Sequence, residues 1–137
     1  MRVNRTESIV AIMLFALAAL AGCQKGPEGG VDFVTPTDGM TVPRTVKVVM
    51  KVEGMKVRPA GKLVEGTGHH HLIIDGSYVP KGEIVPKDAK HLHFGKGQTE
   101  AVVTLTPGDH TLTLQFANGH HESYGKDWSR TIRVHVK

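Results

Sequence analysis

Seven of the nine histidines of the chain fall into three tight groups. The groups are His69-His70-His71, His91-x-His93 and His120-His121. Neutral imidazole is the most common protein ligand for zinc and copper, and histidines at this density replace apolar side chains that a fold would otherwise bury. The chemistry that these residues predict is the binding of a transition metal, provided that the fold brings the groups together.

Histidine is the main metal-ligand type that the sequence offers, because cysteine and methionine are few. Cys23 is the only cysteine, so the sequence predicts no disulfide, no CxxC redox site and no thiolate metal site. Met40, Met50 and Met55 offer thioether partners for Cu(I), although methionine more often fills a core. The intrinsic affinity of imidazole sites for copper favours copper slightly over zinc.

The first 22 residues have the features of an export signal. Two arginines form a basic head, and the apolar run over residues 9–20 is shorter than the roughly 20 residues of a membrane-spanning helix. Leu20-Ala21-Gly22-Cys23 matches the lipobox of bacterial lipoproteins, in which cleavage precedes a cysteine that receives lipid. We therefore expect residues 1–22 to be a lipoprotein signal peptide and Cys23 to be the lipidation site.

The residues after the cleavage site predict location and domain organisation. Gln24, rather than aspartate, resembles the sorting pattern of outer-membrane lipoproteins. We expect an exported, membrane-anchored lipoprotein that faces the periplasm from the outer membrane. Residues 23–30 are expected to be the lipidated cysteine and a flexible tether, because glycine and proline oppose regular structure. Residues 31–137 have the length of a single domain.

The charge pattern excludes one class of partner. The formal net charge is +4, the lysines are scattered, and only 5% of the residues are aromatic. This is not the basic, aromatic-rich surface of a nucleic-acid-binding protein. The expected partners are the membrane, through the lipid on Cys23, and a metal-transfer or envelope protein of unspecified identity.

Hydrophobic alternation predicts strands rather than helices. Apolar and polar residues alternate with period two over 46–53, 111–117 and 131–136, which is typical of half-buried antiparallel strands. Further strands are expected at 31–34, 70–74, 92–94 and 101–105. About seven short strands predict an all-β, immunoglobulin-like antiparallel β-sandwich. The connections 58–68 and 76–90 are expected to be surface loops.

Strand direction predicts that the histidine groups converge. If the strand at 70–74 leaves one end of the sandwich, the strands at 92–94 and 110–117 return to it. Alternation places His69 and His71 on one face of their strand, and likewise His91 with His93, at about 6 to 7 Å within each pair.

The predicted metal ligands are thus His69, His71, His91, His93 and His121. A carboxylate such as Glu122, or backbone carbonyls, would orient the rings. The alternative interpretation is that the same histidines form only a hydrogen-bonded polar network.

Two histidines are assigned other roles. The segment Thr106 to Leu112 resembles the corner entering strand F of such sandwiches, where a tyrosine usually bonds back to the backbone, and His110 takes the place of that tyrosine. His135 alternates with two valines on the last predicted strand, so we expect it on the solvated outer face.

Three long motifs resemble a known family. They are GHHHLIID from Gly68, HFGKGQTE from His93 and PGDHTLTLQFANG from Pro107. From about Val31 to its end, the chain is similar to the bacterial exported family known as domain of unknown function 4399. The resemblance implies a small exported β domain and transfers no settled activity. The family pattern has one histidine before Ser-Tyr-Gly, which falls here on His121, so His120 is an addition.

Two further functional classes stay open. An ion held by three imidazoles with an open position can activate water or cycle electrons, and copper-zinc superoxide dismutase carries a histidine site on a similar sandwich. The sequence contains no GxSxG, HExxH or Cys-His nucleophile pattern, so an enzyme is the less favoured class. The other class is a non-catalytic binding or structural module of the envelope, with a ligand-facing rim at 96–99 and 124–128.

Overall fold

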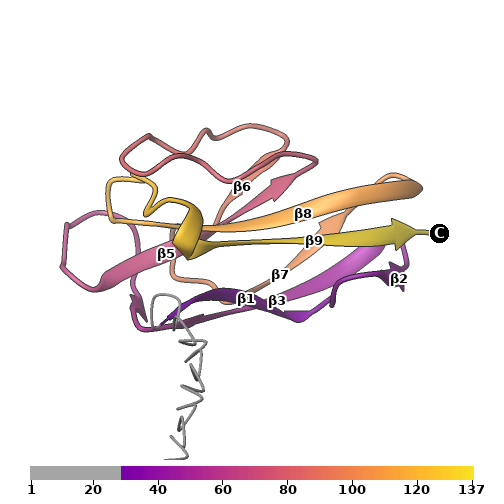
Figure 1. The fold of residues 1–137 in the computed structure, drawn as a ribbon, viewed down its shortest axis with the longest axis horizontal. Coiled ribbons are helices and arrows are strands. Elements are labelled where there is room, and N and C mark those ends of the chain that lie inside the picture. The colour runs from indigo at the N-terminus through magenta and orange to yellow at the C-terminus, as the bar shows by residue number, and fades with distance from the viewer. Residues whose placement is uncertain (1–28) are drawn as a thin grey trace, which may run out of the picture.

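The computed structural model describes residues 29–137, which form two stacked β-sheets (Figure 1). The predicted signal peptide, residues 1–22, and Cys23 lie outside the described residues. The strands are β1 (Gly30–Thr35), β2 (Met40–Val42), β3 (Thr45–Glu53), β4 (Lys56–Val57), β5 (Thr67–Ile74), β6 (His91–His93), β7 (Glu100–Thr104), β8 (Gly108–Ala117) and β9 (Ser129–Val136). A single-turn 3-10 helix, η1 (Lys126–Trp128), precedes β9.

The strand order confirms the predicted all-β sandwich. One sheet has the order β1-β3-β7, and the other has the order β2-β9-β8-β5-β4, with β6 also paired to β5. The neighbours β9, β8 and β5 correspond to strands G, F and C of an immunoglobulin sandwich. Within residues 29–137 there are nine strands rather than about seven. The two additional ones, β2 and β4, have three and two residues, and such short segments carry no readable alternation.

The alternation seen in the sequence places apolar side chains between the sheets. Val46, Val48 and Met50 of β3 face the inner side chains of β8 and β9, all of them almost completely buried. In the view of Figure 1, β1 and β3 form the lower layer and β8 and β9 lie above them. This core uses only one face of β5 and β8, so their other face needs a separate cover.

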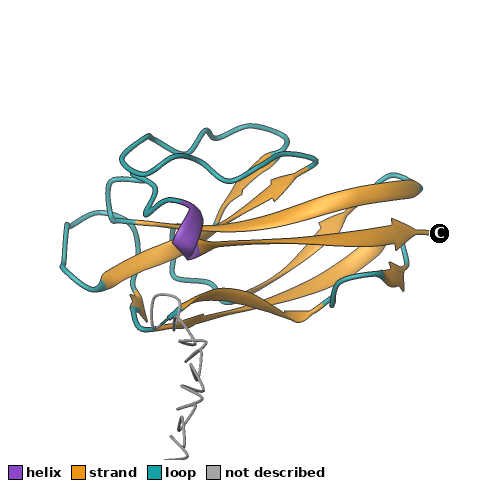
Figure 2. Ribbon diagram, in the orientation of Figure 1, coloured by secondary structure: helices purple, strands orange, loops and turns teal. Residues whose placement is uncertain are grey.

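The long connection between β5 and β6 supplies that cover. It runs above β8 in Figure 2, and its Val79 and Val85 pack with Ile73 and Ala117 in a second small core. Gln115 on β8 fixes the connection, because its Oε1 accepts a hydrogen bond of 2.9 Å from the backbone nitrogen of Val79. The prediction of a simple surface loop over 76–90 was therefore incomplete. The loop closes over the outer face of the sheet.

Within the described part of the chain, no helix is long and apolar enough to cross a membrane.

Candidate metal centre

The central strand β5 divides the first histidine group between two environments. His69 and His71 point to the outer face of the sheet, whereas His70 points to the inner core, where its ring lies 5.1 Å from that of Phe116. All three side chains are at most 1% exposed. The sequence placed them at the beginning of the strand. The strand instead begins at Thr67, because it pairs there with β4, so the histidines lie within it.

The other strands bring two further histidines to the outer face. In the register of β5 with β6, His93 lies directly opposite His71. His121 follows β8 in a turn, where its own nitrogen donates to the carbonyl of Asn118 at 2.9 Å. Its φ of 66° is in the left-handed region, which histidine adopts more readily than most residues.

Four imidazoles thus converge, those of His69, His71, His93 and His121. Each offers a ring nitrogen, and these atoms all lie within 4.8 Å of one another. His69 Nε2 is 3.1 Å from His121 Nδ1 and 3.2 Å from His93 Nε2. Nitrogens that bind one ion at about 2.0 to 2.1 Å in tetrahedral geometry are about 3.3 Å apart. Two of the six nitrogen–nitrogen distances therefore match those of a tetrahedral centre, and the others are at most 4.8 Å.

The ring positions also favour a tetrahedron over a square. The six distances between ring centroids range from 4.6 to 6.0 Å. In a square, the two diagonals would exceed the four edges by about 40%. Only the pair His71–His121, at 6.0 Å, is longer than the rest. The pair that would form the second diagonal, His69–His93, is 5.0 Å apart, as short as the edges.

The contacts of His69 discriminate between an ion site and a polar network. A ring nitrogen carries either one proton or one in-plane lone pair, so it makes one well-directed hydrogen bond. His69 Nε2, however, contacts two other ring nitrogens. Hydrogen bonds alone therefore satisfy this group poorly, whereas an ion at its centre would accept one lone pair from each ring.

Burial favours the neutral form of three of the four rings, those of His69, His71 and His93. Desolvation, reinforced by the neighbouring histidines, lowers the pKa of His69 to about 4 and that of His71 to about 2. Burial and the neighbouring His121 and Lys87 also lower the pKa of His93. Neutral imidazole is the form that binds metal, so these lone pairs are available at pH 7.

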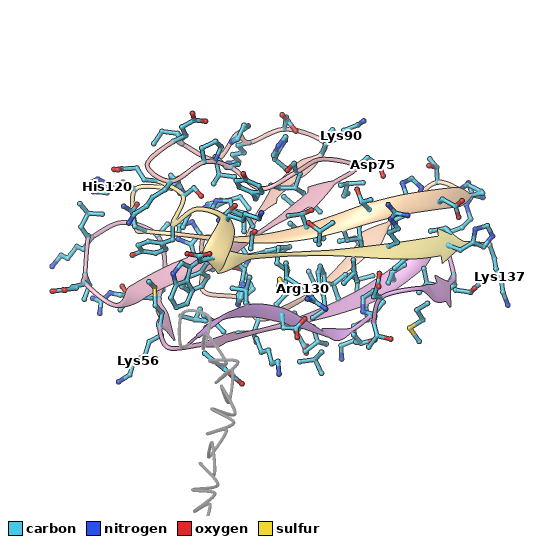
Figure 3. All side chains as sticks on the ribbon, viewed as in Figure 1. Lys56, Asp75, Lys90, His120, Arg130 and Lys137 are labelled. Atoms are coloured by element: carbon cyan, nitrogen blue, oxygen red, sulfur yellow. The ribbon has the colours of Figure 1, made fainter. Side chains whose placement is uncertain are left out.

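The fifth predicted ligand, His91, lies outside the group. In the register it is opposite Ile73, two residues further along β5 from His71, which is about 6 to 7 Å away. Its Nδ1 lies 2.8 Å from the carboxylate of Asp88 instead. His120 is exposed at the left margin of the molecule in Figure 3, and it is not in the group either.

A pocket of about 260 Å³ opens onto the group. His71, His93 and His121 line it together with the segment Ile84 to Lys87, which forms its outer wall. The backbone nitrogen of Val85 donates to the carbonyl of His121 at 2.9 Å, which ties this wall to the loop of the fourth histidine. Sequence patterns do not identify this segment as part of the site, because it lies in an irregular connection without a motif.

The methionines do not join the histidines. Met50 is buried between the sheets, and Met40 lies on β2, separated from β5 by β9 and β8. Met55 packs against the same inter-sheet core. The thioether partners considered for Cu(I) are therefore directed elsewhere, and no hydrogen bond in the described structure joins Glu122 or another carboxylate to the four rings.

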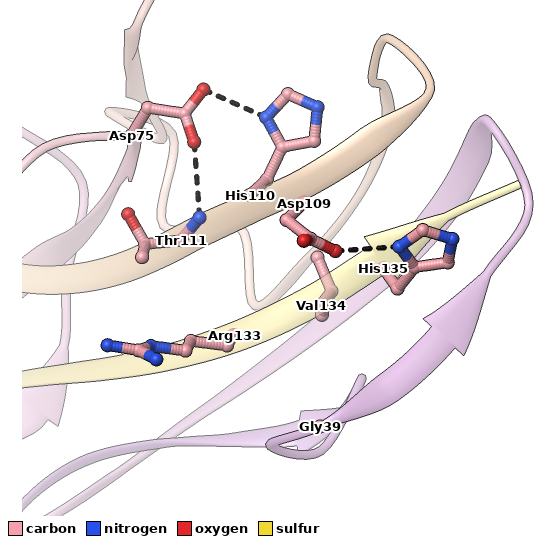
Figure 4. Close-up of a pocket in the computed structure, with 8 residues that line it drawn as sticks. All are labelled: Gly39, Asp75, Asp109, His110, Thr111, Arg133, Val134 and His135. Carbon is pink, nitrogen blue, oxygen red and sulfur yellow. Dashed lines mark hydrogen bonds and ion pairs between the residues drawn. The ribbon is translucent and has the colours of Figure 1, made fainter.

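His110 forms the corner that the sequence predicted. Its Nε2 lies 2.8 Å from the backbone carbonyl of Thr106, and its Nδ1 lies 2.8 Å from Asp75 Oδ2 (Figure 4). The hydrogen bond with Asp75 raises the pKa of His110. His135, near the same end of the sheet, is more than half exposed and pairs with Asp109 at 2.6 Å. Neither ring belongs to the metal-ligand group.

The rim considered for a binding module is partly occupied by internal contacts. The hydroxyl of Tyr124 donates to the carbonyl of Thr67 at 2.7 Å, and its ring stacks on that of Phe116. Trp128 packs against the same two rings. These aromatic side chains therefore extend the core and do not form a free surface.

Comparison with known proteins gives one match. Residues 48–137 match the family described as Domain of unknown function (DUF4399), which confirms the family resemblance over most of the expected range. No curated protein and no solved structure matches the chain.

Proposed function

The chain belongs to the family Domain of unknown function (DUF4399), whose description assigns no activity, and we propose from the site itself that it binds one transition-metal ion. The ligands are His69, His71, His93 and His121. The observation that carries the proposal is the approach of His69 Nε2 to two other ring nitrogens at 3.1 and 3.2 Å, which suits a shared ion better than hydrogen bonds.

The arrangement favours zinc. Zn²⁺ prefers four tetrahedral nitrogen or sulfur ligands, whereas Cu²⁺ prefers a square-planar or tetragonal set. Five of the six distances between the ring centroids lie between 4.6 and 5.1 Å, which supports the tetrahedral choice. Copper remains the second metal to test, because imidazole also suits it and its intrinsic affinity is higher. The earlier preference for copper depended partly on methionines, and these lie elsewhere in the fold.

The number of ligands favours holding an ion over hydrolysing a substrate. Catalytic zinc sites usually have three protein ligands and an open position, whereas structural zinc sites have four. Four histidines complete a tetrahedron without water. We therefore propose storage, delivery or sensing of the metal by an exported lipoprotein, anchored through Cys23 and facing the periplasm.

Native mass spectrometry tests the proposal directly. The untagged full chain, stripped with chelator and exposed separately to Zn²⁺ and Cu²⁺, should retain one ion per chain, and Zn²⁺ should survive competition with a weak chelator. The variant His93→Ala, which removes a half-buried ligand, should lose the retained ion. A chain that retains no ion under any of these conditions would support the polar-network interpretation and refute metal binding.

A further inference from the structure

The proposed ligand set leaves the charge of the ion unbalanced. All four ligands are imidazoles, which are uncharged when they bind metal, so a divalent ion would keep its full charge of +2. The group contains no carboxylate. A charge in a partly desolvated position is costly unless an opposite charge lies beside it. An ion at this site therefore creates a strong local preference for an anion.

The pocket gives an anion access to one side of the ion. It is lined by His71, His93 and His121 but not by His69, so it opens on one triangular face of the tetrahedron. A fifth ligand entering through that face would lie opposite His69. Zinc is able to expand from four to five ligands, as catalytic zinc sites do, so a pocket on this face would allow the four-histidine centre to take one more.

The wall of the pocket combines apolar side chains with one cation. Ile84, Val85 and Pro86 form the apolar part, and Ile84 is 60% exposed. Lys87 supplies the charge, and it forms no ion pair within residues 29–137. The nearest acidic residue in the chain, Asp88, is bonded to His91.

We propose that the pocket binds a short-chain carboxylate, which bonds the ion as a fifth ligand, pairs with Lys87 and lays its alkyl chain against Ile84, Val85 and Pro86. This inference rests on the proposed metal site. The apolar wall favours an organic acid over a strongly hydrated inorganic anion. At about 260 Å³, the pocket is smaller than the roughly 300 to 1,000 Å³ of sites for drug-sized ligands, so it suits a small acid.

Cobalt substitution separates this inference from the metal proposal. Tetrahedral Co²⁺ absorbs visible light strongly and five-coordinate Co²⁺ absorbs weakly, so the full chain loaded with Co²⁺ reports both states. Titration with butyrate should lower the absorption in a saturable manner. Along the series acetate, propionate and butyrate, each methylene should tighten binding about fourfold.

Matched lysine variants test the role of the cation. Lys87→Gln should weaken butyrate binding to the Co²⁺-loaded chain about tenfold. Lys137→Gln removes the same charge at the opposite end of the molecule from His120 (Figure 3), and it should leave the butyrate affinity unchanged.

A tetrahedral spectrum that butyrate does not alter would overturn the carboxylate inference and leave the metal site standing. Inorganic phosphate that binds as tightly as butyrate, or affinity that does not rise with chain length, would also overturn it. A chain that binds no Co²⁺ would overturn both proposals.

Discussion

Gly95 leaves the space that the imidazole of His93 occupies. A methyl group on Gly95 would overlap this ring and lie 2.6 Å from Nε2, the atom that approaches His69. Carbon and nitrogen atoms without a bond between them do not approach this closely, so a side chain at this position must displace the ring. The glycine therefore positions a candidate ligand, although it has no ligand atom of its own.

Gly95→Ala should consequently weaken Zn²⁺ binding about ten- to hundredfold, the usual range for residues that orient a metal ligand. Chelator competition measures the affinity. Gly108→Ala is the control, because a Cβ there meets nothing within 4 Å although its φ of 114° is strained for other residues. The control should lose stability and retain metal affinity. Equal Zn²⁺ affinity in the two variants would show that Zn²⁺ binding does not depend on the position of the His93 ring.

Single substitutions should distinguish the four converging histidines from their neighbours. His121→Ala removes a ligand and should lower Zn²⁺ affinity at least tenfold. His91→Ala and His120→Ala should leave the affinity within about twofold, because neither ring reaches the group. Isothermal titration of the three variants provides the comparison. A large loss in His91→Ala would restore the five-ligand set predicted from the sequence.

The metal-free chain should lose stability on mild acidification. Burial lowers the pKa of His69 and of His70 to about 4, and that of His71 further, whereas an unfolded histidine titrates near 6.5. The unfolded state then binds more protons, so stability is complete above about pH 6.5 and falls as the pH drops towards 4. At pH 5 each of these residues should lower the free energy of unfolding of the metal-free chain by about 2 kcal/mol.

Urea unfolding at pH 7.5 and pH 5 measures this loss. His70 offers a control, since it faces Phe116 in the core and both its ring nitrogens lack partners among the described residues. His70→Leu should reduce the difference between the two pH values by about 2 kcal/mol. An unchanged difference would mean that His70 is not held neutral by burial.

The corner histidine should affect stability alone. His110→Ala removes the hydrogen bonds to Thr106 and Asp75, and it should lower the free energy of unfolding by about 1 to 3 kcal/mol. Because the pKa of His110 is raised in the folded state, the positive charge of its ring contributes to the free energy of unfolding at low pH. This contribution declines as the pH rises through the folded-state pKa. Denaturant unfolding and Zn²⁺ titration should show reduced stability with unchanged affinity. Normal stability with lost metal binding would reverse the assignment.

The anchoring prediction is independent of the fold. Cys23→Ser removes the only thiol that can receive lipid, so uncleaved precursor should accumulate. Mass spectrometry of the membrane fraction distinguishes precursor from mature chain. Recovery of the normal mature mass from the variant would contradict the lipoprotein prediction.

Alternation and strand direction were enough to predict the sandwich and the convergence of three histidine groups. They could not select between His91 and His93, which share a face by alternation. That choice depends on the register of β5 with β6, which sets His93 against His71 and His91 against Ile73. Register is fixed by packing between distant segments, and the three residues of β6 carry too little pattern to reveal it.

The burial of the connection between β5 and β6 could not be predicted from the sequence either. Val79 and Val85 lie in two short apolar runs of an irregular connection, and without periodicity the sequence does not distinguish buried Val85 from exposed Ile84 beside it. They are buried because Ile73 and Ala117 leave an apolar surface on the outside of the sheet.

The separation of the ligands along the chain gives the ion a mechanical role. His71, His93 and His121 belong to β5, β6 and the turn after β8, so one ion would connect three segments directly, in addition to their backbone pairing and the apolar cores. Small domains with a limited core often obtain such connections from disulfides, which a chain whose only cysteine is Cys23 cannot form internally. Metal supply would then determine how long the protein resists proteases, since closing long loops restricts the unfolded chain.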